Sequence, residues 1–381
     1  VESTVNKLAD RLSMDPIVLR QKNMIHEGDV MPAYYGETAN SCRLEECLLK
    51  ASDMIGWKEK GMRTVMPDGK IRARGVAMAM QGSSISNCDV GSVTVKLSDE
   101  GTYHITVGCT DMGTGCDTII AQFAADVLET PIDNISVYGV DTDISPYDSG
   151  SYASSTTYLT GMATVKACEQ LRERIIALAA VRMNKDASAL TFDGENVIDE
   201  SDGAKMSLFD IATASMCNNE ISLEVTYSHS SPVSPPPFMA ACAEIEADPE
   251  TGAIELLDYT ACVDCGTVVN TNLARVQTEG GLLQGIGMTL YEDIWYDERG
   301  KNLSNSFMQY KVPSRLDTDR IRVEFDSSYE PTGPFGAKSI GEIVINTPAP
   351  AIADAVYNAT GVWINELPIT PEKILKGMKV I

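Results

Sequence analysis

The sequence predicts an α+β protein in which mixed sheets are packed with helices. Stretches with helical periodicity and stretches with strand-like alternation follow one another without the regular spacing of βαβ units. Several of the predicted strands are joined by short turns rich in Gly and Pro. The 381 residues, of which 44% are hydrophobic, suffice for a large core and for two or three domains.

The first part of the chain changes from helices to strands. Helical periodicity extends over residues 1–25 and again over 43–57, and the Gly/Pro-punctuated stretch 29–42 between them is predicted to be a linker. Residues 72–82 and 91–108 alternate as strands do, and the second stretch is predicted to be a hairpin that turns at residues 99–101.

The remaining elements are predicted from the same patterns. A Gly-rich turn at 109–115 leads into an apolar helix, and a long helix is predicted from about Thr156 to Arg182. Paired strands are predicted around the turn 249–252. A helix interrupted by glycines follows at 272–293, then strands near 291–296 and 320–326, and a helical segment from Glu342 to Tyr357.

The charge of the chain excludes some partners. Its 54 acidic and 30 basic residues give a net charge of −24, and no basic patch is visible. We therefore expect neither nucleic-acid binding nor binding to an anionic membrane. No run of eighteen apolar residues is present, so no membrane-spanning segment is predicted.

Ten cysteines are scattered through apolar stretches, which indicates free thiols in a reducing cytoplasm. The C-x-x-C pair Cys262 and Cys265 lacks a second pair at metal-binding spacing, so a structural role is favoured. The beginning, "VESTVNKLAD", shows no secretion signal and is typical of the middle of a longer chain or of a processed start.

Three polar or Gly-rich stretches could bind a ligand. In "TDMGTGCDT" Gly113 and Gly115 precede a helix and would offer backbone N–H groups to an anion, although many such turns only reverse the chain. In "SGSYASSTT", residues 149–157, six hydroxyl side chains open a helix where one would suffice as a cap. The surplus favours a ligand with many acceptor atoms, such as a phosphate-bearing cofactor.

In the third stretch, four glycines interrupt the helix that follows residue 271. They are Gly280, Gly281, Gly285 and Gly287. Each interior glycine costs about 1 kcal/mol relative to Ala, so close packing against another backbone or a bulky cofactor is expected. Gln277 and Gln284 lie seven residues apart on one face, where they could contact a cofactor or take part in a tight helix contact.

Glu342 raises the main functional question. It directly follows Gly341 in "PFGAKSIGEIVINTPAP" and opens a segment that otherwise looks buried. One interpretation is a carboxylate favourably placed near a helix start. The other is a catalytic base, because an isolated carboxylate in apolar surroundings is less acidic and accepts a proton near neutral pH. The residues alone leave both open.

Taken in order, these motifs resemble the molybdenum-binding subunit of the xanthine dehydrogenase / aldehyde oxidoreductase family of molybdenum hydroxylases. "TDMGTG", "SYASSTTYLTGMATVKAC", "DCGTVVNTNLARVQTEGGLLQGIGMTLYED" and "GAKSIGE" follow as they do in the family's second molybdopterin-binding domain. The resemblance covers essentially the whole chain. It implies a linker from the first such domain at 1–40 and the second domain at 41–381, with subdomains of about 41–215 and 216–381.

The resemblance implies that Glu342 is the catalytic base of a hydroxylation in which the inserted oxygen comes from water. Thr114 replaces the family's usual Gln in its G-Q-G motif, which puts that hydrogen bond in doubt. The implied substrate-channel residues are Gln81, Gly82 and Ser83. The implied cofactor-binding residues are Gly113, Thr114, Gly115, Ala153, Ser154, Ser155, Thr156, Thr157, Gln277, Gln284 and Gly341.

The resemblance also implies the cofactor and the partners. The cofactor is molybdopterin with molybdenum held only through the pterin, and a cytosine dinucleotide form fits a bacterial layout with separate subunits. The implied partners are an upstream first molybdopterin-binding domain, a 2Fe–2S subunit and an FAD subunit. The substrate is expected to be a purine or another N-heterocycle, with aldehydes or carbon monoxide as alternatives. These 381 residues alone are not expected to turn over, and a non-catalytic assembly subunit is the remaining alternative.

Overall fold

The computed structural model describes residues 1–218, 222–314, 316–317 and 320–381. They form two compact units, each assembled from separated stretches of the chain. Unit 1 comprises residues 1–81, 235–330 and 340–381, and unit 2 comprises residues 82–234 and 331–339. These units cut the chain at other places than the expected domains 1–40 and 41–381, which therefore stay a prediction.

Unit 1 is built on a five-stranded sheet with the order β14-β13-β12-β4-β3. Its strands are β3 (Arg63–Val65), β4 (Ile71–Met80), β12 (Phe238–Ala247), β13 (Ile254–Asp264) and β14 (Ile321–Phe325). All pairs are antiparallel except β13 with β14, which run parallel. The apolar runs of β12 and β13 are buried almost throughout, as expected for strands covered on both faces.

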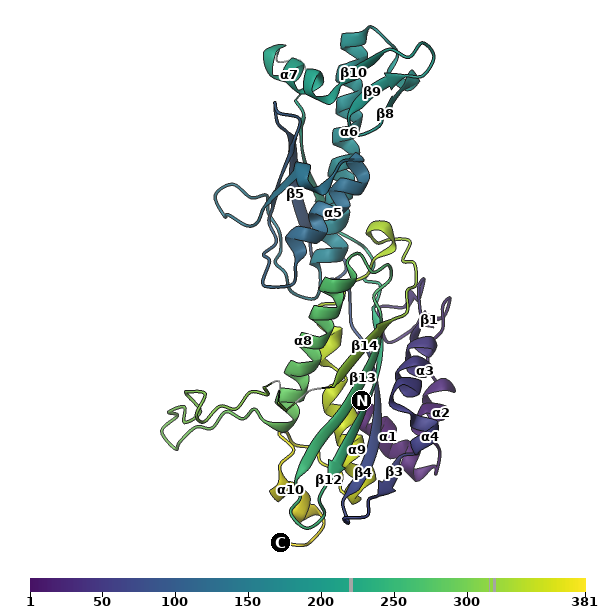
Figure 1. Cartoon of the computed structure of the whole chain (residues 1–381), viewed down its shortest axis with the longest axis vertical. Helices are drawn as coiled ribbons and strands as arrows, with labels where there is room; N and C mark the ends of the chain where they lie inside the picture. Colours follow the sequence, from purple (N-terminus) through teal and green to yellow (C-terminus); the bar gives the residue numbers. More distant parts are fainter. Residues whose placement is uncertain (219–221, 315, 318–319) are drawn as a thin grey trace. The chain divides into compact units, whose positions relative to one another are not determined.

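Helices cover both faces of this sheet (Figure 1). Helix α9 (Pro348–Thr360) packs on β4 and β12, and α3 (Leu44–Ile55) packs on β12 and β13. Gly75 of β4 permits the close approach of α9, because a Cβ there would lie 2.1 Å from the carbonyl oxygen of Ala351. The resulting core includes Ile245, Tyr259 and Ile352, none of them exposed.

Shorter elements complete unit 1. The N-terminal helices are α1 (Glu2–Arg11) and α2 (Pro16–Gln21), and buried Arg20 of α2 forms an ion pair with Glu2 of α1. The remaining elements are β1 (Val30–Met31), β2 (Glu37–Thr38), α4 (Trp57–Lys60), α8 (Thr271–Leu290), the 3₁₀ turn η5 (Ile343–Ile345) and α10 (Pro371–Gly377).

Unit 2 has a four-stranded sheet with the order β11-β5-β6-β7. Its strands are β5 (Gly91–Leu97), β6 (Tyr103–Val107), β7 (Ile135–Tyr138) and β11 (Glu224–His229). Helices α5 (Cys116–Leu128) and α6 (Gly161–Met183) bury one apolar stripe each in a shared core with β5 and β6. A π-helical turn, η2 (Thr156–Thr160), leads directly into α6.

A small three-stranded sheet and a short helix complete unit 2. The strands β8 (Leu190–Phe192), β9 (Asn196–Asp199) and β10 (Lys205–Ser207) pair in the order β10-β9-β8, and α7 covers Leu208–Asn218. The other short turns are η1 (Ile132–Asn134), η3 (Ala187–Ala189) and η4 (Pro334–Gly336).

The observed elements confirm the α+β class and most of the predicted helices and strands. The strand predicted near 291–296 is wrong, since only an isolated bridge between Tyr296 and Asn302 forms there. Alternating apolar residues in this segment suggested a strand, but no neighbouring strand pairs with it along its length. The predicted linker 29–42 contains β1 and β2. The stretch "ISLEVTYSH", residues 221–229, is also predicted from the sequence to be a strand, and its first residue, Ile221, lies outside the described residues.

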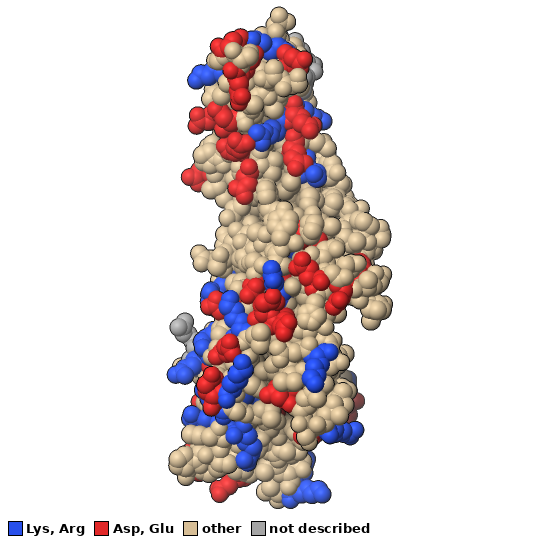
Figure 2. Space-filling model, turned by 90° about the vertical axis from the view of Figure 1, so that its right-hand side faces the viewer, with Lys and Arg blue, Asp and Glu red and all other residues tan. Residues whose placement is uncertain are grey.

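No helix within the described residues is long and apolar enough to cross a membrane. On the face drawn in Figure 2, Lys and Arg side chains are scattered among Asp and Glu rather than gathered in one basic patch. All ten cysteines are free thiols, of which Cys88 and Cys217 are exposed and the other eight are buried.

Candidate functional site

Glu342 lies in unit 1 at the start of the turn η5, and its side chain is exposed. The apolar surroundings that the sequence suggested for this carboxylate are therefore not found. Glu342 makes no side-chain capping hydrogen bond, and α9 begins only after Thr347. Both interpretations of Glu342, a carboxylate near a helix start and a catalytic base, stay predictions. Nε2 of Gln81 donates to Oε2 of Glu342 over 3.3 Å, which joins two residues that are 261 positions apart.

Helix α8 supports this turn from one side. Nε2 of Gln277 donates to the carbonyl oxygen of Gly341 over 2.8 Å, so it contacts the residue directly before Glu342. A Cβ at Gly281 would lie 2.1 Å from Cγ2 of Val344, and one at Gly285 would lie 2.6 Å from Cγ of Pro348. These glycines let the helix approach residues 341–348 closely and so hold Glu342 in place.

The two glutamines of α8 differ in their surroundings. Gln277 is half-buried against the Glu342 turn, whereas Gln284 is exposed and makes no side-chain hydrogen bond to any described residue. Both were predicted to contact a cofactor because they lie on one face of a helix. The structure brings together Gln277, Gly341, Glu342 and Gln81, and it leaves Gln284 facing open space.

In unit 2 the Gly113–Gly115 turn is closed by its own carboxylate. Oδ1 of Asp111 accepts from the backbone N–H of Gly113 over 2.8 Å and of Gly115 over 3.2 Å. The expectation that these two N–H groups are free for an anion is therefore wrong. Both glycines have positive φ, 98° and 76°, which a residue with a Cβ rarely adopts. The side chain of Thr114 makes no hydrogen bond to a described residue.

The hydroxyl groups of residues 149–157 mostly connect loops and do not cap a helix. Ser149 bonds to the backbone of Val90, and Ser151 bonds to the backbone of Thr110. Neither η2 nor α6 has a side-chain cap. Thr156 and Thr157 are half-buried, and their hydroxyls bond to no described residue. These two hydroxyls remain available for a ligand, whereas the surplus seen in the sequence is largely used within the protein.

Strained backbone marks the junction of the loops 82–84 and 153–154. The φ angles of Ser84, Ala153 and Ser154 are 113°, 49° and 56°, although none of these residues is a glycine. The N–H of Ser84 donates to the carbonyl oxygen of Ala153 over 3.0 Å, and Ser339 bonds to both Ser83 and Ser154. Residues held in such conformations are concentrated at functional sites.

Ser84 was not singled out from the sequence, yet it carries a further signal. Its hydroxyl is buried and has no hydrogen-bond partner among the described residues. Buried polar atoms are nearly always satisfied, so an unsatisfied one next to strained loops indicates a missing polar ligand or water. No sequence pattern predicts a serine with a φ of 113°, because the strain arises only when loops that are distant in the sequence pack together.

The loops of unit 2 also carry acidic groups. Burial raises the pKa of Asp148, and burial together with nearby Asp111 raises the pKa of Asp117. The ligand atoms of Asp111, Cys116 and Asp117 lie within 4.8 Å of one another. Because Asp111 already binds the backbone of its own turn, we interpret this cluster as part of the turn structure.

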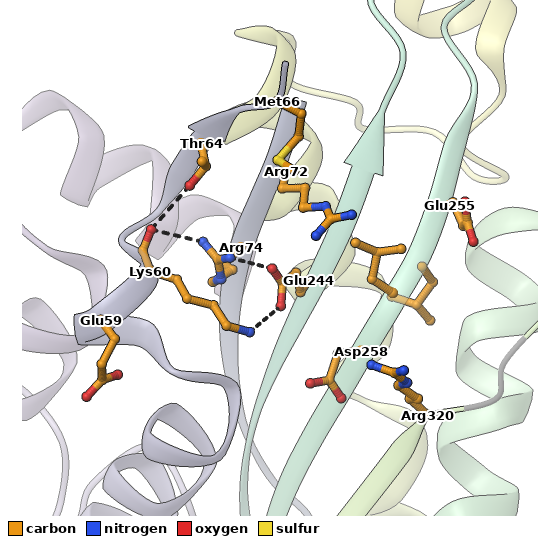
Figure 3. Close-up of a pocket in the computed structure, with 12 residues that line it drawn as sticks. Glu59, Lys60, Thr64, Met66, Arg72, Arg74, Glu244, Glu255, Asp258 and Arg320 are labelled. Atoms are coloured by element: carbon orange, nitrogen blue, oxygen red, sulfur yellow. Dashed lines mark hydrogen bonds and ion pairs between the residues drawn. The ribbon is translucent and has the colours of Figure 1, made fainter. Parts of the chain in front are cut away.

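A separate cavity of about 900 Å³ lies on the sheet of unit 1 and contains none of the predicted site residues (Figure 3). On its floor, buried Arg74 pairs with Glu244, and Lys60 pairs with the second oxygen of that carboxylate over 2.9 Å. Arg322 binds Asp258 beside it. These charges satisfy one another, so the floor is a structural ion-pair network and does not resemble a catalytic centre.

Within each unit, then, the structure assembles one polar group. Unit 1 places a carboxylate on a glycine-lined turn next to two amide side chains, and unit 2 joins strained, hydroxyl-bearing loops at the start of a long helix. The carboxylate of unit 1 can move a proton, and the hydroxyls of unit 2 can bind a polar cofactor. Taken separately, these two features are those of a cofactor-binding protein with a candidate base.

Comparison with known proteins identifies the class. Residues 50–319 match the model of the molybdopterin cofactor-binding domain. The chain is 36% identical to the probable hypoxanthine oxidase of Escherichia coli strain K12 and 31% identical to the xanthine dehydrogenase molybdenum-binding subunit of Escherichia coli O157:H7. Both alignments cover 98% of this chain but only 40% and 51% of the relatives, so the chain spans about half of their length or less.

Solved structures agree with this assignment. The carbon monoxide dehydrogenase of Oligotropha carboxidovorans superposes with a TM-score of 0.88 at 25% identity, over the whole of this chain and 50% of that one. Quinoline 2-oxidoreductase from Pseudomonas putida 86 gives the same TM-score at 24% identity, over 99% of this chain and 51% of that one, and supports the fold alone. The chain belongs to the molybdopterin-binding subunits of the xanthine dehydrogenase / aldehyde oxidoreductase family of molybdenum hydroxylases.

The described residues fit such a cofactor. The pterin is rich in hydrogen-bonding atoms, and unit 2 offers the unsatisfied hydroxyl of Ser84 together with those of Thr156 and Thr157. The loops that carry the predicted residues 113–115 and 153–157 are joined within this unit by the hydrogen bonds between Thr110 and Ser151. No described side chain would need to coordinate the metal, which the pterin itself binds.

Proposed function

We propose that this chain is the second molybdopterin-binding part of an oxidoreductase that hydroxylates a purine or another N-heterocycle, with Glu342 as the catalytic base. The observation that carries the proposal is the position of Glu342, which is exposed on a turn that Gln81 and α8 hold in place. An exposed carboxylate on a turn that is held in place can exchange a proton with a substrate or water.

The residues have distinct roles in this proposal. Glu342 accepts the proton of the water whose oxygen is inserted, and Gln81 orients the carboxylate through its amide N–H. Gln277 binds the carbonyl oxygen of Gly341 and so fixes the backbone that leads into Glu342. Gln81 together with Gly82 and Ser83 would border the substrate channel.

Cofactor binding would involve both groups of residues. In unit 2 these are Gly113, Thr114, Gly115 and Ala153–Thr157, and in unit 1 they are Gln277, Gln284 and Gly341. When bound, molybdopterin with its molybdenum supplies the redox chemistry that removes two electrons from the substrate. Because Asp111 occupies two amides of the Gly113–Gly115 turn, contacts from that turn would come from Thr114 and the remaining backbone.

The choice of substrate rests on the relatives. The relatives at 36% and 31% identity are named for hypoxanthine and xanthine, whereas the aldehyde oxidoreductase molybdenum-binding subunit of Escherichia coli strain K12 is 28% identical. We therefore propose purines as the first candidate class of substrate and aldehydes as the second. Electrons would pass to 2Fe–2S and FAD partners, a first molybdopterin-binding domain would complete the enzyme, and the cytosine dinucleotide form of the pterin is proposed. Free thiols throughout the chain are consistent with a bacterial cytoplasm.

The test uses the assembly purified through a tag on this chain from cells that carry the gene. We expect stoichiometric molybdenum and oxidation of hypoxanthine or a related heterocycle in preference to benzaldehyde. Glu342→Gln should lower kcat by about 10²–10⁴-fold, which is the usual contribution of a general base, and leave the molybdenum content unchanged.

Glu366→Gln, an exposed carboxylate in the same unit, is the matched control and should leave kcat unchanged. Unchanged turnover in Glu342→Gln would refute the assignment of the base. A complete lack of molybdenum in the wild-type assembly would instead support the non-catalytic alternative.

A further inference from the structure

One glycine of α8 has no explanation within this chain. Cβ atoms at Gly281 and Gly285 would collide with Val344 and Pro348, so close packing inside unit 1 requires these two glycines, and a Cβ at Gly287 would displace the side chain of Glu292. A Cβ at Gly280 would meet no atom within 4 Å, and its φ is not positive. A glycine inside a helix is unfavourable, so something outside the described residues is the expected reason for it.

Gly280 lies in an uncharged, exposed row along α8. Val276, Gly280, Gln284 and Met288 follow one another at four-residue spacing, and all four are exposed. Rows of this spacing form the ridges that helices use to pack against one another, and a glycine in the row lets a partner's backbone come close. The other side of the helix packs against the Glu342 turn.

The row continues into a segment that projects from unit 1, which we call the arm (residues 291–314; Figure 1, left). The arm is ordered by local hydrogen bonds, such as that from the N–H of Leu303 to the carbonyl oxygen of Trp295 over 2.7 Å. It nevertheless carries large apolar side chains that nothing in the described chain covers. They are Ile294, Trp295, Tyr296, Leu303, Phe307, Met308 and Val312, with exposures from 47% to 80%.

This surface has the size and composition of a protein interface. An aromatic side chain buries about 150–250 Å² when it is fully covered. On this scale, the exposed side chains of the arm and the helix row together offer roughly 800–1,000 Å² of surface that a partner could bury. That is about one side of a standard interface, roughly 800 Å² per partner. Trp and Tyr are also the residues that most often dominate binding energy at interfaces.

We propose that the row Val276–Gly280–Gln284–Met288 and the arm form one docking surface for the other half of the molybdopterin-binding subunit. The occupant is inferred from length, since the relatives align with this chain over only 40% and 51% of their own residues. The part of each relative that does not align with this chain belongs to the same polypeptide as the part that does. That part is therefore the partner that we propose for this surface. This inference rests on the proposed function.

The first experiment separates folding from docking. Gly280→Leu should raise the Tm of the isolated chain, because leucine favours the helix and its Cβ would meet no atom within 4 Å, and Gly280→Ala should also raise the Tm. In the tagged assembly, Gly280→Leu should reduce recovery of the first molybdopterin-binding half about tenfold or more, which is the effect of disturbing an interface centre. Unchanged recovery would overturn the proposal.

Val181→Leu is the matched control, since Val181 is an exposed helix residue of α6 in unit 2. It should change neither the Tm of the isolated chain nor the recovery of the assembly by a measurable factor.

The second experiment identifies the occupant. A photo-reactive p-benzoylphenylalanine replaces Phe307, which is 80% exposed, and the cross-linked peptides of the purified assembly are sequenced. We expect peptides from a first molybdopterin-binding half. Cross-links to a second copy of this chain, to the iron–sulfur subunit or to any other protein, or no cross-link at all, would overturn the proposal.

The same probe at Phe209 in unit 2, also exposed, serves as the control and should give no cross-link to that half. Molybdenum analysis of the wild-type assembly distinguishes the two proposals. Absence of the metal would refute the enzymatic function while leaving the cross-link result intact.

Discussion

At the scale of single residues, Ser84 combines two unfavourable features. Its φ of 113° lies in a region that only glycine adopts readily, and its buried hydroxyl has no partner among the described residues. The backbone of Ser84 is nonetheless held on both sides, by Ala153 and by the hydroxyl of Ser234. The surrounding loops therefore impose the conformation, which is the pattern expected where a ligand is later bound.

Ser84→Gly should stabilise unit 2. The substitution removes the backbone strain and the unsatisfied hydroxyl, and we expect a gain of about 1–2 kcal/mol in the free energy of unfolding, measured in urea. Ser83→Gly is the matched control and should destabilise, because the hydroxyl of Ser83 accepts from the N–H of Ser339 over 3.1 Å. A loss of stability in Ser84→Gly would contradict the strain argument.

Asp354 is the second residue whose surroundings in the folded protein are energetically unfavourable. It is buried in α9, and this burial raises its pKa to about 7, although the N–H of Val76 donates to it over 3.1 Å. The folded protein therefore binds more protons at this site than the unfolded chain does between about pH 4 and pH 7. Stability from this group is present at low pH and is lost as the pH rises through that window.

Asp354→Asn should accordingly stabilise the protein at pH 8 and have little effect near pH 4. The asparagine oxygen can still accept from Val76, while the cost of ionising a buried acid disappears; that cost is roughly 4 kcal/mol for a shift of this size. Urea unfolding at both pH values checks this. An equal effect at pH 4 and pH 8 would show that Asp354 ionises without penalty.

At the scale of elements, glycines decide which surfaces come together. The same residue type occurs at Gly75 in β4 and at Gly280 in α8, yet their surroundings are opposite. A Cβ at Gly75 would lie 2.1 Å from the carbonyl oxygen of Ala351 and 2.4 Å from the N of Ala355, whereas one at Gly280 meets nothing. The backbone of α9 thus rests directly on the sheet.

Gly75→Ala should lower the free energy of unfolding by about 3 kcal/mol or more, because the colliding atoms belong to a helix backbone that cannot turn aside. Gly280→Ala, the matched substitution, should raise it by up to about 1 kcal/mol. Thermal or urea unfolding of the two variants provides the comparison. A small effect of Gly75→Ala would mean that α9 can slide on the sheet.

At the scale of the whole molecule, the charge is the dominant physical property. With 54 acidic and 30 basic residues, the folded chain concentrates a net charge of −24, and this self-repulsion opposes the compact state. Buried pairs such as Arg20 with Glu2 are short-range and only weakly screened by salt. The unpaired surface acids are the ones that added salt should screen.

We therefore expect the Tm at pH 8 to rise by a few degrees as NaCl increases from about 0.01 M to about 0.3 M, a range over which the screening length falls several-fold. At pH 5, nearer the pI of about 4.4, the same series should give a smaller rise. Differential scanning calorimetry measures both. A Tm that falls with salt at pH 8 would show that surface ion pairs outweigh the net repulsion.

The candidate site could be anticipated only in part. The position of Glu342 after a glycine in an apolar stretch singled it out, and the family motifs agree with the comparisons. Its contact with Gln81 could not be anticipated, because the two residues are 261 positions apart. The same holds for Asp111, since local spacing suggested free amides at Gly113 and Gly115 and only the turn geometry showed that a carboxylate binds both.

The sequence by itself determined the α+β class, most helices and strands, and the family, because side-chain periodicity and short motifs are local properties of the chain. The tertiary structure alone decided that Glu342 is exposed and accepts from Gln81, that the hydroxyls of 149–155 mostly join loops, and that Gly280 differs from Gly281. Those outcomes depend on which distant segments pack together, and packing is a property of the folded core that no short stretch of residues encodes.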